Sequence, residues 1–135
     1  MPFQWTGNAR NRAEQDISAS ELTVLIVDDD RFFREMAAAL LDGQGLVVVG
    51  DAADGAAGIE QACRLRPDVV LLDIQLPDLS GFEVCRILVD AGLQVVLCSA
   101  REASAYGPLV ARSGARGFIS KTVLSPQELT RIIES

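Results

Sequence analysis

Acidic side chains stand directly behind two apolar segments of this 135-residue chain. Asp28 and Asp29 follow the segment 22–27, and Asp73 follows the segment 69–72. Carboxylates that lie close together repel, so their charged forms are stable together only with a cation between them. Hard oxygen ligands of this kind suit Mg²⁺, which keeps part of its hydration shell and commonly shares its site with phosphate. We therefore expect a magnesium site wherever the chain brings these acids together.

A hydroxyl and an ammonium group occupy the same kind of position further along the chain. Ser99 ends the apolar segment 95–99, and Lys121 follows the segment 117–120. A lysine and a hydroxyl can bind phosphoryl oxygens, and catalysis of phosphoryl transfer consists mostly of positioning and charge neutralisation. A carboxylate can itself accept the phosphoryl group as an aspartyl phosphate. Asp73 is the best candidate acceptor because it is the lone acid at the end of its segment.

Five apolar segments of strand length alternate with segments whose apolar residues recur at helical spacing. The predicted strands are 22–27, 46–49, 69–72, 95–99 and 117–120. This alternation predicts an α/β domain with a parallel sheet covered by helices on both faces. The carboxyl ends of parallel strands meet at one edge of the sheet, where ligands bind. The five functional candidates should converge at that edge: Asp28, Asp29, Asp73, Ser99 and Lys121.

The predicted helices differ in quality. The first should turn one apolar face to the sheet, made of Phe33, Met36, Ala37, Leu40 and Leu41. Gly107-Pro108 interrupts the fourth, and a proline inside a helix costs about 3 kcal/mol. We expect an irregular segment over 101–107 and a shortened fourth helix that starts near Pro108. The last helix begins at Ser125-Pro126, a favourable N-cap and first position.

Length and composition indicate one domain with a sizeable core. Residues 1–20 are polar and aperiodic, and we interpret them as a flexible tail before a folded domain over 21–135. The net charge of −7 argues against direct binding of nucleic acid or of anionic membranes. No apolar run is long enough to span a bilayer. The cysteines, Cys63, Cys85 and Cys98, fit core positions in a reducing, cytoplasmic compartment, and the lack of histidine excludes Ser-His and Cys-His catalysis.

In the order of these residues the chain resembles the receiver domains of two-component response regulators, over about residues 22–135. The resemblance is carried by Asp28-Asp29, the segment Asp-Ile-Gln-Leu-Pro-Asp-Leu-Ser-Gly at 73–81, Ser99-Ala100, Phe118 and Lys121. It implies a flavodoxin-like, doubly wound sheet of five parallel strands in the order 2-1-3-4-5, with five helices. It also implies a signalling module that is not an enzyme, except that it catalyses its own phosphoryl transfer and dephosphorylation.

The resemblance implies a role for each acidic residue at the carboxyl edge of the predicted sheet, which we call the acidic edge. Asp73 would accept a phosphoryl group from a histidine kinase or a histidine phosphotransfer protein. Asp29, Asp73 and the main-chain carbonyl of Gln75 would bind Mg²⁺ directly, whereas Asp28 would act through water.

The resemblance also implies a conformational switch. Ser99 and Lys121 would contact the phosphoryl oxygens, and Phe118 would swing inward when the Ser99 hydroxyl moves toward the phosphate. The surface around the fourth helix, fifth strand and fifth helix would then control a downstream protein or an output domain. The family commonly has proline after the lysine, whereas Thr122 stands here, so we expect no cis peptide at that step.

Several neighbouring polar residues have structural interpretations. We predict Asp30 as the N-cap of the first helix and Gly81 as a turn residue. Asp78 and Ser80 are interpreted as solvated loop residues. Cys98 precedes Ser99 in a strand and should point to the opposite face of the sheet.

Other functions are less consistent with the sequence. A Mg²⁺-dependent phosphatase with an aspartyl intermediate usually needs an acid two positions after the nucleophile, where this chain has Gln75. A flavin- or nucleotide-binding module needs a phosphate-cradling loop after the first strand, where the three aspartates 28–30 would repel phosphate. A degenerate receiver that acts as a constitutive interaction or dimerisation module is the alternative. Formation of a homodimer is a further alternative, although the sequence shows no clear exposed apolar stripe that would form its interface. The chain is either a stand-alone receiver or a fragment of a longer regulator, for example one with a DNA-binding output.

Overall fold

The computed structural model describes residues 21–135, so the predicted tail over 1–20 lies outside the described residues. Five strands form a single sheet in the order β2-β1-β3-β4-β5, and every neighbouring pair is parallel. The strands are β1 (Leu22–Val27), β2 (Leu46–Ala52), β3 (Val69–Asp73), β4 (Val95–Ser99) and β5 (Gly117–Ser120). The predicted flavodoxin-like topology is confirmed.

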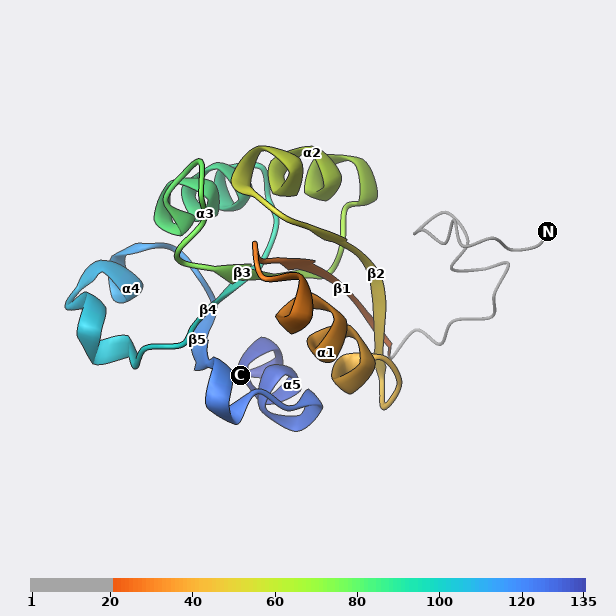
Figure 1. Cartoon of the computed structure of the whole chain (residues 1–135). Helices are drawn as coiled ribbons and strands as arrows, with labels where there is room; N and C mark the ends of the chain where they lie inside the picture. The colour runs from red at the N-terminus through yellow and green to blue at the C-terminus, as the bar shows by residue number, and fades with distance from the viewer. Residues whose placement is uncertain (1–20) are drawn as a thin grey trace.

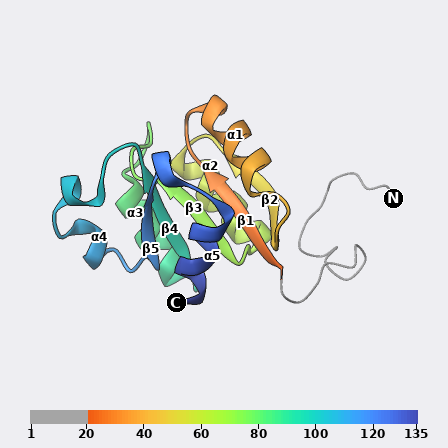
Figure 2. The same ribbon diagram turned by 90° about the horizontal axis from the view of Figure 1, so that it is seen from below.

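Helices cover both faces of this sheet (Figures 1 and 2). Helices α1 (Arg31–Leu41) and α5 (Pro126–Glu134) pack on one face, and α2 (Gly55–Leu65) and α3 (Gly81–Asp90) pack on the other. The short α4 (Leu109–Arg112) lies beside β5 at the sheet edge. Among residues 21–135, no helix combines the length and the apolar composition that a membrane span requires.

The apolar core is divided by the sheet into two clusters. Every residue of the central strands β3 and β4 is buried, which explains their continuous apolar runs, since parallel strands are covered on both faces. Leu71 faces the cluster under α1 and α5, whereas the adjacent Leu72 faces the cluster under α2 and α3. The alternation also places Cys98 and Leu97 on opposite faces. This fixed alternation decides which side chain at each strand end points to which face.

The buried face of α1 is narrower than predicted. Phe33, Ala37 and Leu41 are buried, whereas Met36 and Leu40 are 44% and 39% exposed. The buried residues recur every four positions, and a neighbour one position earlier lies about 100° around the helix. Met36 and Leu40 therefore lie toward solvent, and the prediction of a five-residue face was wrong. The prediction for Cys63 as a core residue was wrong too, because it is exposed on α2.

Two loop residues after β3 are structural caps, which corrects their interpretation as solvated loop residues. Ser80 is the N-cap of α3 and forms a capping box with Glu83, a pattern that the S-x-x-E sequence carries. The Asp78 carboxylate accepts hydrogen bonds from the backbone N–H groups of Gly55 and Ala56, at 2.8 and 3.0 Å. It therefore caps α2, a helix 22 and 23 residues away in the chain, which no local pattern could indicate.

Gly81 fixes the position of the loop that follows the acceptor strand. It is the first residue of α3, and its N–H donates to the carbonyl of Ile74 at 2.7 Å. A Cβ atom at Gly81 would lie 2.4 Å from the carbonyl oxygen of Asp73. Any side chain at this position would therefore push the loop away from the end of β3.

The segment between β4 and β5 is irregular, as predicted. A 3-10 helix, η2 (Ala103–Tyr106), is followed by α4 with Pro108 as its N-cap. Neither short helix contains a buried residue. After β5, Lys121 begins another 3-10 helix, η3 (Lys121–Val123), and all peptide bonds within residues 21–135 are trans.

Candidate functional site

The predicted site residues are brought together at the carboxyl edge of the sheet. Asp28 follows β1, while Asp73 and Ser99 end β3 and β4, and Lys121 follows β5. The parallel register pairs Asp73 with Cys98 and Ser99 with Ser120. The ends of the strands are therefore level, which allows side chains from four strands to reach the same space.

Three carboxylates form the acidic part of this site. One oxygen each of Asp28, Asp29 and Asp73 lies within 4.8 Å of the other two. Asp28 and Asp73 are buried and Asp29 is exposed. The loop that carries Asp28 and Asp29 is fixed by Arg34, whose guanidinium donates to the carbonyl oxygen of Asp28 at 2.8 Å and pairs with Asp51 at 3.1 Å.

The two oxygens of Asp28 have different surroundings. Oδ1 accepts a hydrogen bond from the N–H of Asp30 at 2.8 Å, and Asp30 itself caps α1 as predicted. Oδ2 is fully buried and accepts no well-directed hydrogen bond, although Lys121 Nζ lies at ion-pair distance, 2.7 Å. A buried carboxylate oxygen with unused acceptor capacity is a favourable place for a cation or a water molecule held by one.

Lys121 is held in the site from two sides. Its Nζ lies 2.7 Å from Asp28 and 3.8 Å from Asp73, and it sits over the ring of Phe33 at 4.3 Å from the centroid. Burial lowers the pKa of Lys121, but the ion-pair interactions with the carboxylates of Asp28 and Asp73 outweigh it, and the net shift is upward. The ammonium group is therefore charged at neutral pH. The sequence placed Phe33 in the core and gave no sign of this contact.

Asp73 is a carboxyl group in an unfavourable environment for its own charge. Burial raises its pKa to about 6, and the charge of Asp28 adds to the increase, whereas Lys121 opposes it. The N–H of Gln75 lies 3.3 Å from Asp73 Oδ1, and the Gln75 residue is exposed. A second cation near Asp73 would favour the charged form further.

These residues fit a divalent cation. The donor set consists of hard oxygen atoms, the ligands that Mg²⁺ prefers. Two of the three carboxylates are buried with a single ammonium group beside them, so negative charge at this edge exceeds the positive charge within contact. Exposure of Asp29 leaves an open side for water and for a phosphoryl group. The site therefore has both the ligands and the access that a magnesium-phosphate centre needs.

Ser99 lies in the site but is bonded elsewhere. Its buried hydroxyl lies 2.6 Å from the hydroxyl of Tyr106 and accepts from the N–H of Arg101 at 3.0 Å. No hydrogen bond joins Ser99 to Asp73 within the described residues. Tyr106 also contacts Phe118, with ring centroids 6.3 Å apart. Sequence reasoning missed Tyr106, because it falls in an irregular segment without periodicity.

Comparison with known proteins identifies relatives over most of the described residues. The family model described as "Response regulator receiver domain" matches residues 24–134. The DNA-binding response regulator MtrA of Mycolicibacterium paratuberculosis is 38% identical over 109 residues, which cover 78% of this chain and 47% of MtrA. The chemotaxis protein CheY of Thermotoga maritima is 32% identical over 114 residues, with 83% of this chain and 92% of CheY covered.

The solved structures agree with this result. The signal receiver domain of the response regulator NarL from Mycobacterium tuberculosis superposes with a TM-score of 0.78 and 30% identity. The match covers 86% of this chain and 98% of that domain. By contrast, the chain spans about half the length of the MtrA proteins that it matches.

Proposed function

The chain belongs to the response regulator receiver family, and from this premise we propose that Asp73 is its phosphoryl acceptor. A single observation carries the proposal: a buried carboxylate with two further acids and one lysine around it, all at the carboxyl edge of the sheet. The raised pKa of Asp73, about 6, still leaves most of it ionised at pH 7. The acceptor is therefore available as a nucleophile.

Transfer to Asp73 exchanges one bond for another. A carboxylate oxygen of Asp73 forms a P–O bond as the P–N bond of a phosphohistidine on a kinase or phosphotransfer protein breaks. The bonding electron pair stays on the imidazole nitrogen of the donor. Bound Mg²⁺ would neutralise charge on the phosphoryl oxygens during this step. Asp29, Asp73 and the Gln75 carbonyl would hold the ion directly, and Asp28 would hold it through water.

Lys121 and Ser99 complete the set of groups that bind the phosphoryl oxygens. The Lys121 ammonium lies 3.8 Å from Asp73 and needs only a small movement to contact an oxygen of an attached phosphoryl group. Ser99 supplies a hydroxyl donor from the adjacent strand. Lys121 acts by its charge and Ser99 by hydrogen bonding, and such positioning and electrostatic stabilisation are the main source of catalysis in phosphoryl transfer.

Loss of the phosphoryl group is a slow reaction of the same site in this proposal. The oxygen of a water molecule bonds to phosphorus as the P–O bond to Asp73 breaks, and the electron pair returns to the carboxylate. The proton of the water leaves with inorganic phosphate. Gln75 stands where a general acid or base would assist such hydrolysis, and its amide cannot transfer a proton at neutral pH. This favours a signalling module over a multiple-turnover phosphatase.

Partners follow from the surfaces next to the site. Helix α1 exposes Phe32, Met36 and Leu40 at four-residue spacing, and Phe32 is 81% exposed. This apolar stripe, which sequence reasoning missed, begins two residues after Asp30 and so adjoins the acidic edge. We infer that it docks the phosphodonor protein.

Helices η2 and α4 contain no buried residue, which suits a surface that changes conformation to control a downstream protein or output domain. The three free cysteines suit a cytoplasmic location.

Intact mass measurement tests the acceptor directly. The purified chain is incubated with acetyl phosphate and Mg²⁺, beside an Asp73→Asn variant and an Asp90→Asn variant as a matched control outside the cluster. We expect one added phosphoryl group in the wild type and in Asp90→Asn, none in Asp73→Asn, and none after removal of Mg²⁺ by EDTA. An equal gain in Asp73→Asn would refute the proposed acceptor. No gain in any sample would favour the degenerate receiver with a constitutive partner.

A further inference from the structure

Tyr106 connects the two residues of the expected switch. Its hydroxyl lies 2.6 Å from Ser99 Oγ, and its ring contacts Phe118 at a centroid distance of 6.3 Å. Tyr106 is the only tyrosine of the chain and is half-buried at the end of η2. Tyr106 therefore links Ser99 and Phe118, because it is hydrogen-bonded to Ser99 and packed against Phe118.

The hydrogen bonds of Ser99 limit where its hydroxyl can go. The oxygen already accepts from the N–H of Arg101 at 3.0 Å and is paired with Tyr106. A serine hydroxyl has one proton and two acceptor sites. In the resting protein both contacts direct the hydroxyl toward the segment that follows β4. A side-chain rotation that brings the hydroxyl to a phosphoryl oxygen on Asp73 must give up the bond to Tyr106.

We propose that Tyr106 is a positioning residue that holds Ser99 in its resting orientation and is released when Asp73 is phosphorylated. This inference rests on the proposed function. The Ser99–Tyr106 bond stabilises the resting state only, so it opposes the active state by the net free energy of one hydrogen bond. Its loss frees the Tyr106 ring, and with it η2, which has no buried residue of its own.

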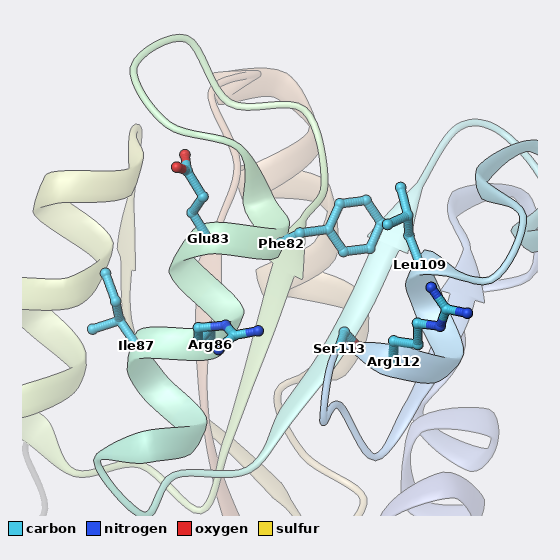
Figure 3. A pocket seen from close by; sticks show the side chains of 7 residues that line it. All are labelled: Phe82, Glu83, Arg86, Ile87, Leu109, Arg112 and Ser113. Atoms are coloured by element: carbon cyan, nitrogen blue, oxygen red, sulfur yellow. The ribbon is translucent and has the colours of Figure 1, made fainter.

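The ring of Tyr106 transmits its position to the surface through Phe82. The two rings are in edge contact, with centroids 5.8 Å apart and planes at 71°. Phe82 lines a groove of about 610 Å³ between α3 and α4, where its ring points toward Leu109 on the opposite wall (Figure 3). Release of Tyr106 would remove the support behind one wall of this groove. We therefore expect the orientation of Ser99 to affect the shape of the α3–α4 groove.

The single tyrosine makes this testable by NMR. Protein with ¹³C-labelled tyrosine rings gives signals from Tyr106 alone, and beryllofluoride with Mg²⁺ serves as the phosphoryl analogue. We expect the Tyr106 ring signals to shift when the analogue binds. In the Ser99→Ala variant, the same signals should lie near the shifted position even without the analogue. Asp73→Asn is the control and should show no shift. ¹⁹F signals from bound fluoride report occupancy of the site independently.

A second variant separates the hydroxyl from the ring. Tyr106→Phe keeps the contacts with Phe82 and Phe118 and loses only the bond to Ser99. We expect it to bind beryllofluoride about three- to tenfold more tightly than the wild type, because a net hydrogen bond of the resting state is gone. Loss of a merely structural contact would not tighten binding.

The outcomes are distinguishable. Bound fluoride with unmoved Tyr106 signals, or unchanged or weaker binding by Tyr106→Phe, would overturn the role of Tyr106 and leave Asp73 as the acceptor. The absence of bound fluoride in the wild type would overturn the proposed function and this inference together.

Discussion

Lys121 is paired with Asp28 in the resting protein, with 2.7 Å between Nζ and the buried Oδ2. The distance from the same nitrogen to Asp73 is 3.8 Å. The lysine thus neutralises Asp28, which follows strand β1, more directly than it neutralises the proposed acceptor Asp73. It also occupies space at an oxygen that a cation or its water ligand would use, so we expect the ammonium group and a bound Mg²⁺ to compete for Asp28.

Replacement of the lysine should therefore affect metal and phosphoryl group in opposite directions. In Lys121→Met we expect Mg²⁺ to bind about three- to tenfold more tightly, because removal of about 1 kcal/mol of charge repulsion has this effect. Phosphorylation by acetyl phosphate should become slower, because a cation for the phosphoryl oxygens is lost. Isothermal titration calorimetry and intact mass measure the two effects. Arg131→Met, an exposed cation paired with Glu128 on α5, should change neither, and an unaltered Mg²⁺ affinity in Lys121→Met would argue against the competition.

The raised pKa of Asp73 predicts a pH-dependent stability of the metal-free protein. Its folded value of about 6 exceeds the unfolded value of 3.8, so folding disfavours the charged form and this group costs stability as pH rises through that window. Asp73→Asn should stabilise the protein at pH 7. The shift corresponds to about 3 kcal/mol at most, and we expect a gain of about 1–2 kcal/mol, because charges are effectively screened even at buried sites. Urea unfolding in EDTA measures it, and most of the gain should be absent at pH 4. A gain of equal size at both pH values would contradict this origin.

The contact between Phe33 and Lys121 should contribute measurably to the site. Phe33 is buried, and a cation over an aromatic ring is worth about 0.5–1 kcal/mol at exposed sites and about 2 kcal/mol when desolvated. A double-mutant cycle of Phe33→Leu and Lys121→Met should give a coupling energy of this size in unfolding experiments. The matched cycle uses Leu88→Ala, a core change on the other face of the sheet, and should be additive with Lys121→Met. Additivity in both cycles would show that the ring only fills space.

Asp78 should matter for stability although it is exposed and outside the proposed chemistry. Its carboxylate accepts from two backbone N–H groups at the start of α2, and these bonds lower its pKa. Asp78→Ala should lower Tm at neutral pH by more than Asp54→Ala, since the Asp54 N-cap accepts one such bond. The difference should shrink in acid, because a carboxyl group with a lowered folded pKa loses its stabilising effect when it is protonated. Thermal unfolding followed by circular dichroism tests this, and equal Tm values for wild type and Asp78→Ala would refute the capping role.

Much of the fold could be predicted because its signals are local. Four consecutive apolar residues before Asp73 indicate a strand buried on both faces, and Gly107-Pro108 indicates a broken fourth helix. Both features are present. In α1 the error concerns the direction of side chains rather than the type of element. Met36 and Leu40 belong to the correct helix but face solvent, because helical spacing alone does not say how wide the contact with the sheet is.

The sequence by itself determined which chemical groups stand at the ends of which strands, since a parallel α/β alternation brings strand ends to one edge whatever the packing details. It thereby placed Asp28, Asp29 and Asp73 together. Only the tertiary structure decided how these groups are paired. Lys121 pairs with Asp28, and Ser99 pairs with Tyr106. Both pairings depend on distances of a few ångströms between segments that are remote or irregular in sequence. Such distances are set by the packing of helices and loops around the sheet, and no periodicity along the chain encodes them.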